Sequence, residues 1–172
     1  RVDRRQRQMC IRDRNYRIGH GYDVHKLETG EKFVIGGIEI DHDKGAVGHS
    51  DADIIIHVMC DSILGALSEG DIGKHFPDTD EKYKGIDSKE LLVEVVEILH
   101  KKGFEINNID VTVLLQRPKL RNHIDKMIET LSAVMKIDKK KLSIKATTTE
   151  GLGFVGREEG VAAHCVTLIN KI

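Results

Sequence analysis

The chain has 172 residues, of which 40% are hydrophobic and 32% charged, and its formal net charge is -1. This size and apolar content fit one globular domain and exclude a disordered chain. No apolar run approaches the ~20 residues of a membrane-spanning helix, and the balanced charge with few aromatic residues excludes a general nucleic-acid binder. The three cysteines form no CxxC pair, so disulfides are not expected and a reducing cytoplasm is the default compartment. The expected partners are therefore small molecules, with no nucleic acid and no membrane.

Residues 1–16 differ in composition from the rest of the chain. They hold six of the ten Arg and no Lys, whereas all seventeen Lys lie after them. The segment lacks the apolar region of a secretory signal and the Ser and Thr of a transit peptide, although an Arg-rich transit peptide is an alternative. We predict a non-native or disordered leader at 1–16 and a single domain at 17–172.

In chain order, hydrophobic periodicity and turn residues predict the following elements. Strands are expected at 17–25 and at 32–40, where a Gly pair indicates a bend or a bulge. A helix is expected at 51–67, capped by Ser50 or Asp51, and an aperiodic loop at 68–87, whose length indicates function. A helix at 88–103 follows, with Ser88 as N-cap and Gly103 as stop, then a strand at 106–116, a turn at 117–120 and a helix at 122–136. Strands at 141–148 and 160–172 complete the chain. This order predicts an α+β fold, in which one mixed sheet of about four main strands carries helices on one face.

A candidate metal site lies in the first third of the chain. Asp23 and His25 are two residues apart in a predicted strand, so their side chains leave the same face. His57, on the helix that follows, could supply a third ligand. One Asp and two His leave a fourth position open, as in catalytic zinc sites. Taken alone the pattern is weak, and the alternative is a surface Asp with two ordinary histidines.

Two further segments could bind phosphate groups. His49 and Ser50 stand near a helix N-terminus, where backbone N–H groups favour anions, although Ser50 could simply cap the helix. The segment KATTTEGLGFVGR at 145–157 combines three hydroxyls and three glycines with Glu150, a hard ligand for Mg²⁺. Its alternative is a glycine-rich hairpin. The acidic residues of the segment 71–80 are either solvated or form a wall that binds hydroxyls.

Five motifs stand in a fixed order: RIGHGYDVH (17–25), AVGHSDADIIIH (46–57), DIGKHFPDTD (71–80), LLQRPKL (114–120) and KATTTEGLGFVGR (145–157). Together, from Arg17 to the C-terminus, they resemble the family of 2-C-methyl-D-erythritol 2,4-cyclodiphosphate synthases of the non-mevalonate isoprenoid pathway. The resemblance implies a homotrimer whose sheets pack around a three-fold axis and whose active sites lie between neighbouring subunits. It also implies a bacterial cytoplasmic enzyme, with a plastid location less expected, and an isoprenoid diphosphate as a ligand of the trimer channel.

The same resemblance implies roles for residues of these motifs. Asp23, His25 and His57 match the ligands of zinc, or of another divalent transition metal, and Glu150 matches a ligand of Mg²⁺ or Mn²⁺. His49 and Thr148 match residues that stabilise the transition state. The other matches bind the cytidine diphosphate substrate: Ser50, Asp71, Ile72, Gly73, Phe76, Pro77, Asp78, Thr79, Asp80, Leu115, Gln116, Arg117, Pro118, Lys119, Leu120, Arg121, Thr147, Thr149, Phe154 and Arg157. Arg117, Arg121 and Gly151 depart from the family pattern.

The implied reaction converts 4-diphosphocytidyl-2-C-methyl-D-erythritol 2-phosphate to 2-C-methyl-D-erythritol 2,4-cyclodiphosphate and CMP. The 2-phosphate attacks the β-phosphorus, so catalysis needs positioning and charge stabilisation rather than a protein nucleophile. Cys60 and Cys165 are accordingly expected to be small core residues. Two other functions stay open: a zinc-dependent phosphohydrolase, and a non-catalytic trimer that binds isoprenoid diphosphates.

Overall fold

The computed structural model describes residues 16–77, 79 and 81–172. Apart from Tyr16, which begins the first strand, the predicted leader lies outside these residues. The strands are β1 (Tyr16–Thr29), β2 (Phe33–Ile35), β3 (Ile38–Ile40), β4 (Lys44–Ala46), β5 (Phe104–Leu114), β6 (Leu142–Thr147) and β7 (Gly160–Lys171). The helices are α2 (Ile54–Leu67), α3 (Ile72–His75), α4 (Ser88–Lys101), α5 (Ile124–Met135) and α6 (Gly153–Gly156), with the 3-10 turns η1 (Glu81–Tyr83) and η2 (Lys139–Lys141).

The main sheet has five strands in the order β4-β1-β7-β5-β6, so the predicted number of about four was too low. Neighbouring strands are antiparallel except β5 and β6, which makes the sheet mixed, as predicted. The additional strand is β4, a three-residue edge strand that pairs with the end of β1. The segment 32–40, predicted as one strand with a bend or bulge at its Gly pair, is not one strand. It is a separate hairpin of β2 and β3, because Gly36 and Gly37 turn the chain with φ angles of 64° and 75°.

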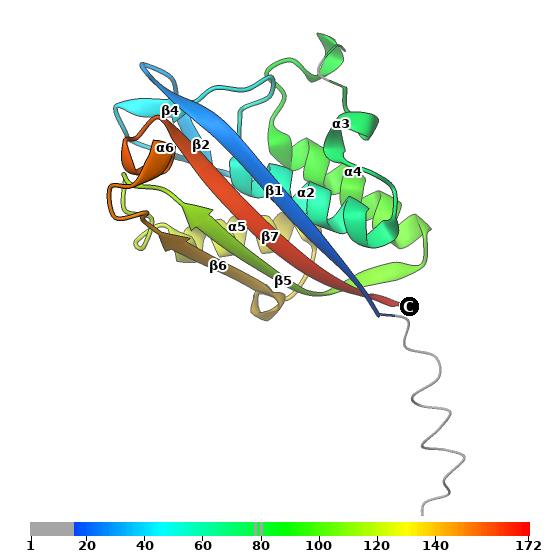
Figure 1. Cartoon of the computed structure of the whole chain (residues 1–172). Helices are drawn as coiled ribbons and strands as arrows, with labels where there is room; N and C mark the ends of the chain where they lie inside the picture. Colours follow the sequence, from blue (N-terminus) through cyan, green and yellow to red (C-terminus); the bar gives the residue numbers. More distant parts are fainter. Residues whose placement is uncertain (1–15, 78, 80) are drawn as a thin grey trace, which may run out of the picture.

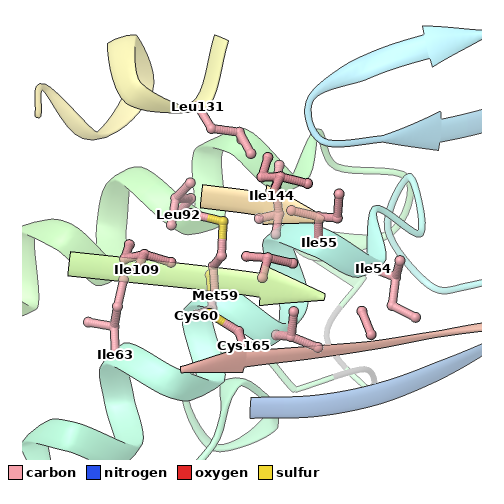
Figure 2. Packing of buried hydrophobic residues seen from close by; sticks show 14 of the residues in the cluster. Ile54, Ile55, Met59, Cys60, Ile63, Leu92, Ile109, Leu131, Ile144 and Cys165 are labelled. Carbon is pink, nitrogen blue, oxygen red and sulfur yellow. The ribbon is translucent and has the colours of Figure 1, made fainter. Parts of the chain in front are cut away.

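The three long helices cover one face of the sheet, as predicted (Figure 1). Helix α2 packs on β1 and β7, α5 packs on β6, and α4 packs on both α2 and α5. The core between these layers contains Ile55, Met59 and Ile63 of α2, all fully buried (Figure 2). Cys60 and Cys165 are buried in the same core, as expected, and burial raises the pKa of the Cys165 thiol to about 11. No helix in the described ranges is long and apolar enough to cross a membrane.

Two glycines of β1 allow α2 to approach the sheet closely. A Cβ atom at Gly19 would lie 1.8 Å from the carbonyl oxygen of Ser62, and one at Gly21 would lie 2.1 Å from that of Val58. Real Cβ atoms do not approach a carbonyl oxygen this closely, so the two positions require residues without a side chain. The close approach brings the first turn of α2 against the middle of β1.

The helix N-caps differ from those predicted. The cap of α2 is Asp53, rather than Ser50 or Asp51, and the cap of α4 is Asp87, rather than Ser88. Asp and Ser are about equally good caps, so the sequence does not distinguish neighbouring candidates. The predicted loop at 68–87 contains the short α3 and η1 but no long element. The side chains of Ser50, Asp51 and Ser88, which do not act as the N-caps, are therefore available for other contacts near the start of both helices.

Candidate active site

Three potential metal ligands meet where α2 crosses β1. Asp23 and His25 come from β1, and His57 comes from the first turn of α2. The Oδ2 atom of Asp23 lies 2.9 Å from His25 Nε2 and 3.3 Å from His57 Nδ1, and the two nitrogen atoms are 3.2 Å apart. Ligands ~2.0 Å from a tetrahedral metal ion are about 3.3 Å from one another, so this spacing fits one divalent ion. It is the one such group among the residues that the structure describes.

Hydrogen bonds to the outer ring nitrogens orient both histidines. Nδ1 of His25 lies 2.9 Å from the carbonyl oxygen of Ala52. A carbonyl can only accept, so Nδ1 carries the proton and Nε2 of the neutral ring offers its lone pair. Nε2 of His57 lies 3.0 Å from Ser50 Oγ, and when it donates there, Nδ1 also offers a lone pair. Two lone pairs and the Asp23 carboxylate then face one point, where a cation would be stabilised.

The local electrostatics favour positive charge at this point. Burial raises the pKa of the Asp23 carboxyl, but its close contacts with the imidazole rings of His25 and His57 outweigh that effect and lower the pKa below its usual range. Burial lowers the pKa of His25, and the hydrogen bond to Asp23 outweighs it, so this pKa is raised. The carboxylate is therefore ionised at neutral pH and stabilises a proton or a metal ion beside it.

These three ligands form part of the wall of a cleft of about 310 Å³, called here the first cleft. Five other residues predicted for the site also line it: His49, Ser50, Ile72, Gly73 and Phe76. Three of the remaining predicted residues in this segment, Asp71, Pro77 and Thr79, do not line it. Asp71 is exposed and caps α3 by accepting a hydrogen bond from Lys74 N–H, and Pro77 and Thr79 are exposed. Asp78 and Asp80 lie outside the described residues.

The predicted nucleotide loop borders a second cleft, of about 700 Å³. The predicted residues that line it are Leu115, Pro118, Lys119, Leu120, Arg121, Thr147 and Thr148. Arg117 turns to Glu158 and donates two hydrogen bonds of 2.8 Å to its carboxylate. The Oε1 atom of Gln116 is buried with no hydrogen-bond partner in the described part of the chain.

In the segment after β6, Glu150 and Phe154 are exposed, whereas Thr148 and Thr149 are half-buried. Glu150 adopts a left-handed φ of 53°, and its carboxylate accepts a hydrogen bond of 3.0 Å from the Thr148 hydroxyl. Thr149 and Phe154 line a smaller hollow on the outer face of the sheet, and Arg157 pairs with a neighbouring carboxylate. None of these five residues lines the first cleft.

The two clefts are separate within one chain. In the sheet register, Asp23 pairs with Ala163, Ala163 with Val113, and Val113 with Ala146. With ~4.8 Å between neighbouring strands, Asp23 and Ala146 are ~14 Å apart. The clefts share no lining residue. A single chain therefore does not bring Thr148 and Glu150 to the three potential metal ligands.

Sequence reasoning missed several residues of the first cleft. Tyr83, Ile86 and Leu91 contribute to its lining. Tyr83 and Ile86 lie in the aperiodic loop, where an isolated apolar residue is the only signal. Ser88 does not line the cleft, but its hydroxyl lies 3.3 Å from His57 Nε2, and it was interpreted only as a helix cap.

Similar sequences and structures cover most of the chain. A family model described as the YgbB family matches residues 16–170. A relative from Geobacter sulfurreducens, named 2-C-methyl-D-erythritol 2,4-cyclodiphosphate synthase, is 54% identical over 155 residues, which cover 90% of this chain and 99% of the relative.

Solved structures with the same fold are also known. The bifunctional IspDF from Campylobacter jejuni matches with a TM-score of 0.90 and 37% identity over 93% of this chain, which spans 43% of that longer protein. IspF from Plasmodium falciparum, in a complex named for CDP, matches with a TM-score of 0.81 and 34% identity, covering 91% of this chain and 96% of that one.

Proposed function

Because this chain belongs to the YgbB family, we propose that it converts 4-diphosphocytidyl-2-C-methyl-D-erythritol 2-phosphate to 2-C-methyl-D-erythritol 2,4-cyclodiphosphate and CMP. The observation that carries the proposal is the 54% identity, over 90% of the chain, to a relative named for this cyclic product. The catalytic domain would run from the start of β1 to the C-terminus, and the leader would take no part in the reaction. The expected location is the bacterial cytoplasm.

We assign Asp23, His25 and His57 as ligands of zinc or another divalent transition metal. Their spacing of 2.9 to 3.3 Å and their convergent lone pairs support this assignment. Glu150 is assigned as the protein ligand of Mg²⁺ or Mn²⁺, because Mg²⁺ is commonly bound by one carboxylate together with substrate phosphates. When bound, such ions would polarise the reacting phosphate and neutralise charge on the leaving CMP.

The side chains of the protein would position two polyanionic groups rather than supply a nucleophile. The 2-phosphate is already ionised at neutral pH, so no general base is needed. His49 and Ser50, which line the first cleft, would stabilise phosphate oxygens there, and Thr148 would do so from the second cleft. The apolar side chains of Ile72 and Phe76 suit the methylerythritol carbons.

The second cleft is assigned to the cytidine group. The loop residues 115–121 and the segment 147–157 keep the substrate-binding roles that the resemblance implies. The bound CDP named for the Plasmodium falciparum structure supports a cytidine nucleotide as the ligand of this family. Because Arg117 is held by Glu158, we assign it to the support of this loop rather than to direct contact with the base.

The outer face of the sheet supports a trimer. Ile18, Tyr22 and Val24 of β1 and Val166 of β7 lie on the face away from the helices and are 39% to 70% exposed. His20 and His164 lie among these side chains on the same face, and neighbouring copies would cover the whole group. The channel between three such sheets is the expected place for an isoprenoid diphosphate. Light scattering should then give three times the mass of one chain.

A composite active site would explain why the two clefts are separate in one chain. In a cyclic trimer, the first cleft of one subunit would face the second cleft of its neighbour. Two different inactive variants should then rescue each other, because some interfaces of a mixed trimer join two intact halves. His57→Ala and Glu150→Gln are unfolded together, refolded and assayed against each variant refolded alone. Efficient mixing without recovered activity would contradict the composite site.

The reaction itself is tested by ³¹P NMR on the purified protein with its substrate, Zn²⁺ and Mg²⁺. We expect CMP and a cyclic diphosphate in equal amounts. A phosphohydrolase would instead give a linear product with free phosphate ends. A non-catalytic binder would leave the substrate unchanged. Either of these outcomes would reject the proposed synthase activity.

A further inference from the structure

A chain of polar side chains connects His57 to the start of α4. The hydroxyl of Ser50 lies 3.0 Å from His57 Nε2, and the hydroxyl of Ser88 lies 3.2 Å from Ser50 Oγ and 3.3 Å from His57 Nε2. Ser88 Oγ donates to Asp51 Oδ1 at 2.5 Å. Ser88 is fully buried, so water does not compete for these contacts. The chain therefore ends on a carboxylate that is not itself among the potential metal ligands.

The donors and acceptors of this chain give a consistent direction. The Asp51 carboxylate accepts from the backbone N–H groups of Ser88 and Asp53, each at 3.2 Å, as well as from the Ser88 hydroxyl. Having given its one proton to Asp51, Ser88 can only accept from Ser50 or His57. If the Ser50 hydroxyl donates to Ser88, its contact of 3.0 Å with His57 Nε2 requires Nε2 to be the donor, and this is the direction that we infer. The lone pair of His57 Nδ1 is then directed to the metal position.

The segment that carries these groups is itself fixed by backbone contacts. The N–H of Asp51 donates to the carbonyl of Ile86 at 3.1 Å, and the N–H of Gly85 donates to the carbonyl of His49 at 2.7 Å. Within the same segment, Ala52 adopts a left-handed φ of 57° and presents its carbonyl to His25. The short stretch from 49 to 53 thus orients both histidine rings.

We propose that Asp51 and Ser88 are positioning residues that hold His57 in its Nε2–H tautomer and thereby strengthen metal binding. The inference rests on the proposed metal site. Neither residue lines the first cleft, so their effect is expected on metal affinity rather than on substrate contacts. Partners that orient a metal-binding histidine typically change affinity by about 10- to 100-fold.

The first experiment measures the affinity of the metal-free full-length protein for Zn²⁺ alone, by competition with a chromogenic chelator. Ser88→Ala is expected to weaken binding by about 10- to 100-fold, and Ser88→Thr, which keeps the hydroxyl, should restore most of it. Ser62→Ala is the matched control, because Ser62 is also fully buried and its hydroxyl bonds to Met59 O and Thr167 Oγ1 instead. An equal loss in Ser62→Ala would attribute the effect to general destabilisation and overturn the inference.

The second experiment reads the tautomer directly. Long-range ¹H–¹⁵N NMR of the metal-free protein should show His57 protonated at Nε2 in the wild type and a mixture of tautomers in Ser88→Ala. Asp51→Asn should also give a mixture of tautomers, because an amide cannot accept on both of its terminal atoms. If Ser88→Ala does not fold, the Asp51→Asn variant provides the test. If Ser88→Ala and Asp51→Asn both bound Zn²⁺ as tightly as the wild type while His57→Ala lost binding, the inference would be wrong but the metal site would stand. Retained binding in His57→Ala would reject the metal site itself.

Discussion

Gly21 connects the fold to the candidate metal site, and its replacement by alanine should damage both. A Cβ atom at this position would lie 2.1 Å from the carbonyl oxygen of Val58 and 2.9 Å from its carbonyl carbon. A carbon–oxygen contact needs about 3.3 Å, so α2 must move away from β1 by ~1 Å. His57 immediately precedes Val58 and would move with it, whereas Asp23 and His25 stay on β1.

The expected size of the effect follows from this displacement. A site must hold its ligands to within ~0.5 Å, and a misplacement of ~1 Å can cost a factor of about 100. We expect Gly21→Ala to weaken Zn²⁺ binding by about 10- to 100-fold and to destabilise the fold by ~1 to 3 kcal/mol, as overpacking does. Chelator competition and thermal unfolding measure the two quantities.

The matched control is Gly65→Ala on the same helix. A Cβ atom there would meet only the carbonyl oxygen of His20, at 3.9 Å, which is an ordinary contact. Alanine is favoured over glycine in a helix by ~1 kcal/mol, so this variant should be at least as stable as the wild type and bind Zn²⁺ equally well. If Gly21→Ala also matched the wild type in both assays, the close approach of α2 would not set the ligand geometry, and the reasoning would be wrong.

Three other predictions concern the rest of the chain. Burial raises the pKa of Cys165 to about 11 and that of Cys60 well above its usual value, so at pH 8 both thiols are protonated and mass spectrometry should find them unmodified by iodoacetamide until the protein is unfolded. Asp53→Asn should lower the free energy of unfolding by about 2 kcal/mol in urea, because the buried carboxylate accepts from the N–H groups of Gly36 and Gly37, at 2.9 and 2.6 Å, and an amide has only one acceptor atom. Deletion of residues 1–15 should leave the melting temperature unchanged, since this Arg-rich stretch lacks apolar periodicity and the family match begins at residue 16, and a fall of several degrees would show that the leader stabilises the domain.

The long elements of the fold are predictable because local patterns determine them. The apolar periodicity of α4 and α5 and the β-branched residues of β5 and β7 agree with the side chains that they bury. The hairpin at 33–40 is not predictable in this way, since a Gly pair suits a bulge as well as a turn. Asp53, seventeen and sixteen residues after Gly36 and Gly37, accepts hydrogen bonds from both glycines and selects the turn. The short β4 has no pattern of its own and forms because β1 offers it a partner.

Part of the candidate site is likewise predictable from local sequence patterns, and part is not. The spacing of Asp23 and His25 predicts a shared face, since residues two apart in a strand point to the same side. The convergence of His57 on that pair depends on how closely α2 approaches β1, which no single motif encodes. Ser88 was missed because a serine at a helix start usually acts as a cap, whereas here Asp87 takes that role and leaves the hydroxyl directed to His57. The substrate followed from the resemblance and not from the residue chemistry.

The alternation of β1 explains how one strand can serve both proposed tasks. Its inward positions, Gly21 and His25 among them, face α2 and hold the potential metal ligands, whereas its outward positions, Tyr22 and Val24, form the apolar face proposed to contact other copies. A shift of one residue would exchange the two sets. Unbroken antiparallel pairing with β7, from Tyr16↔Asn170 to Lys26↔Gly160, prevents such a shift. The register that fixes the ligands therefore also fixes the surface on which the trimer would assemble.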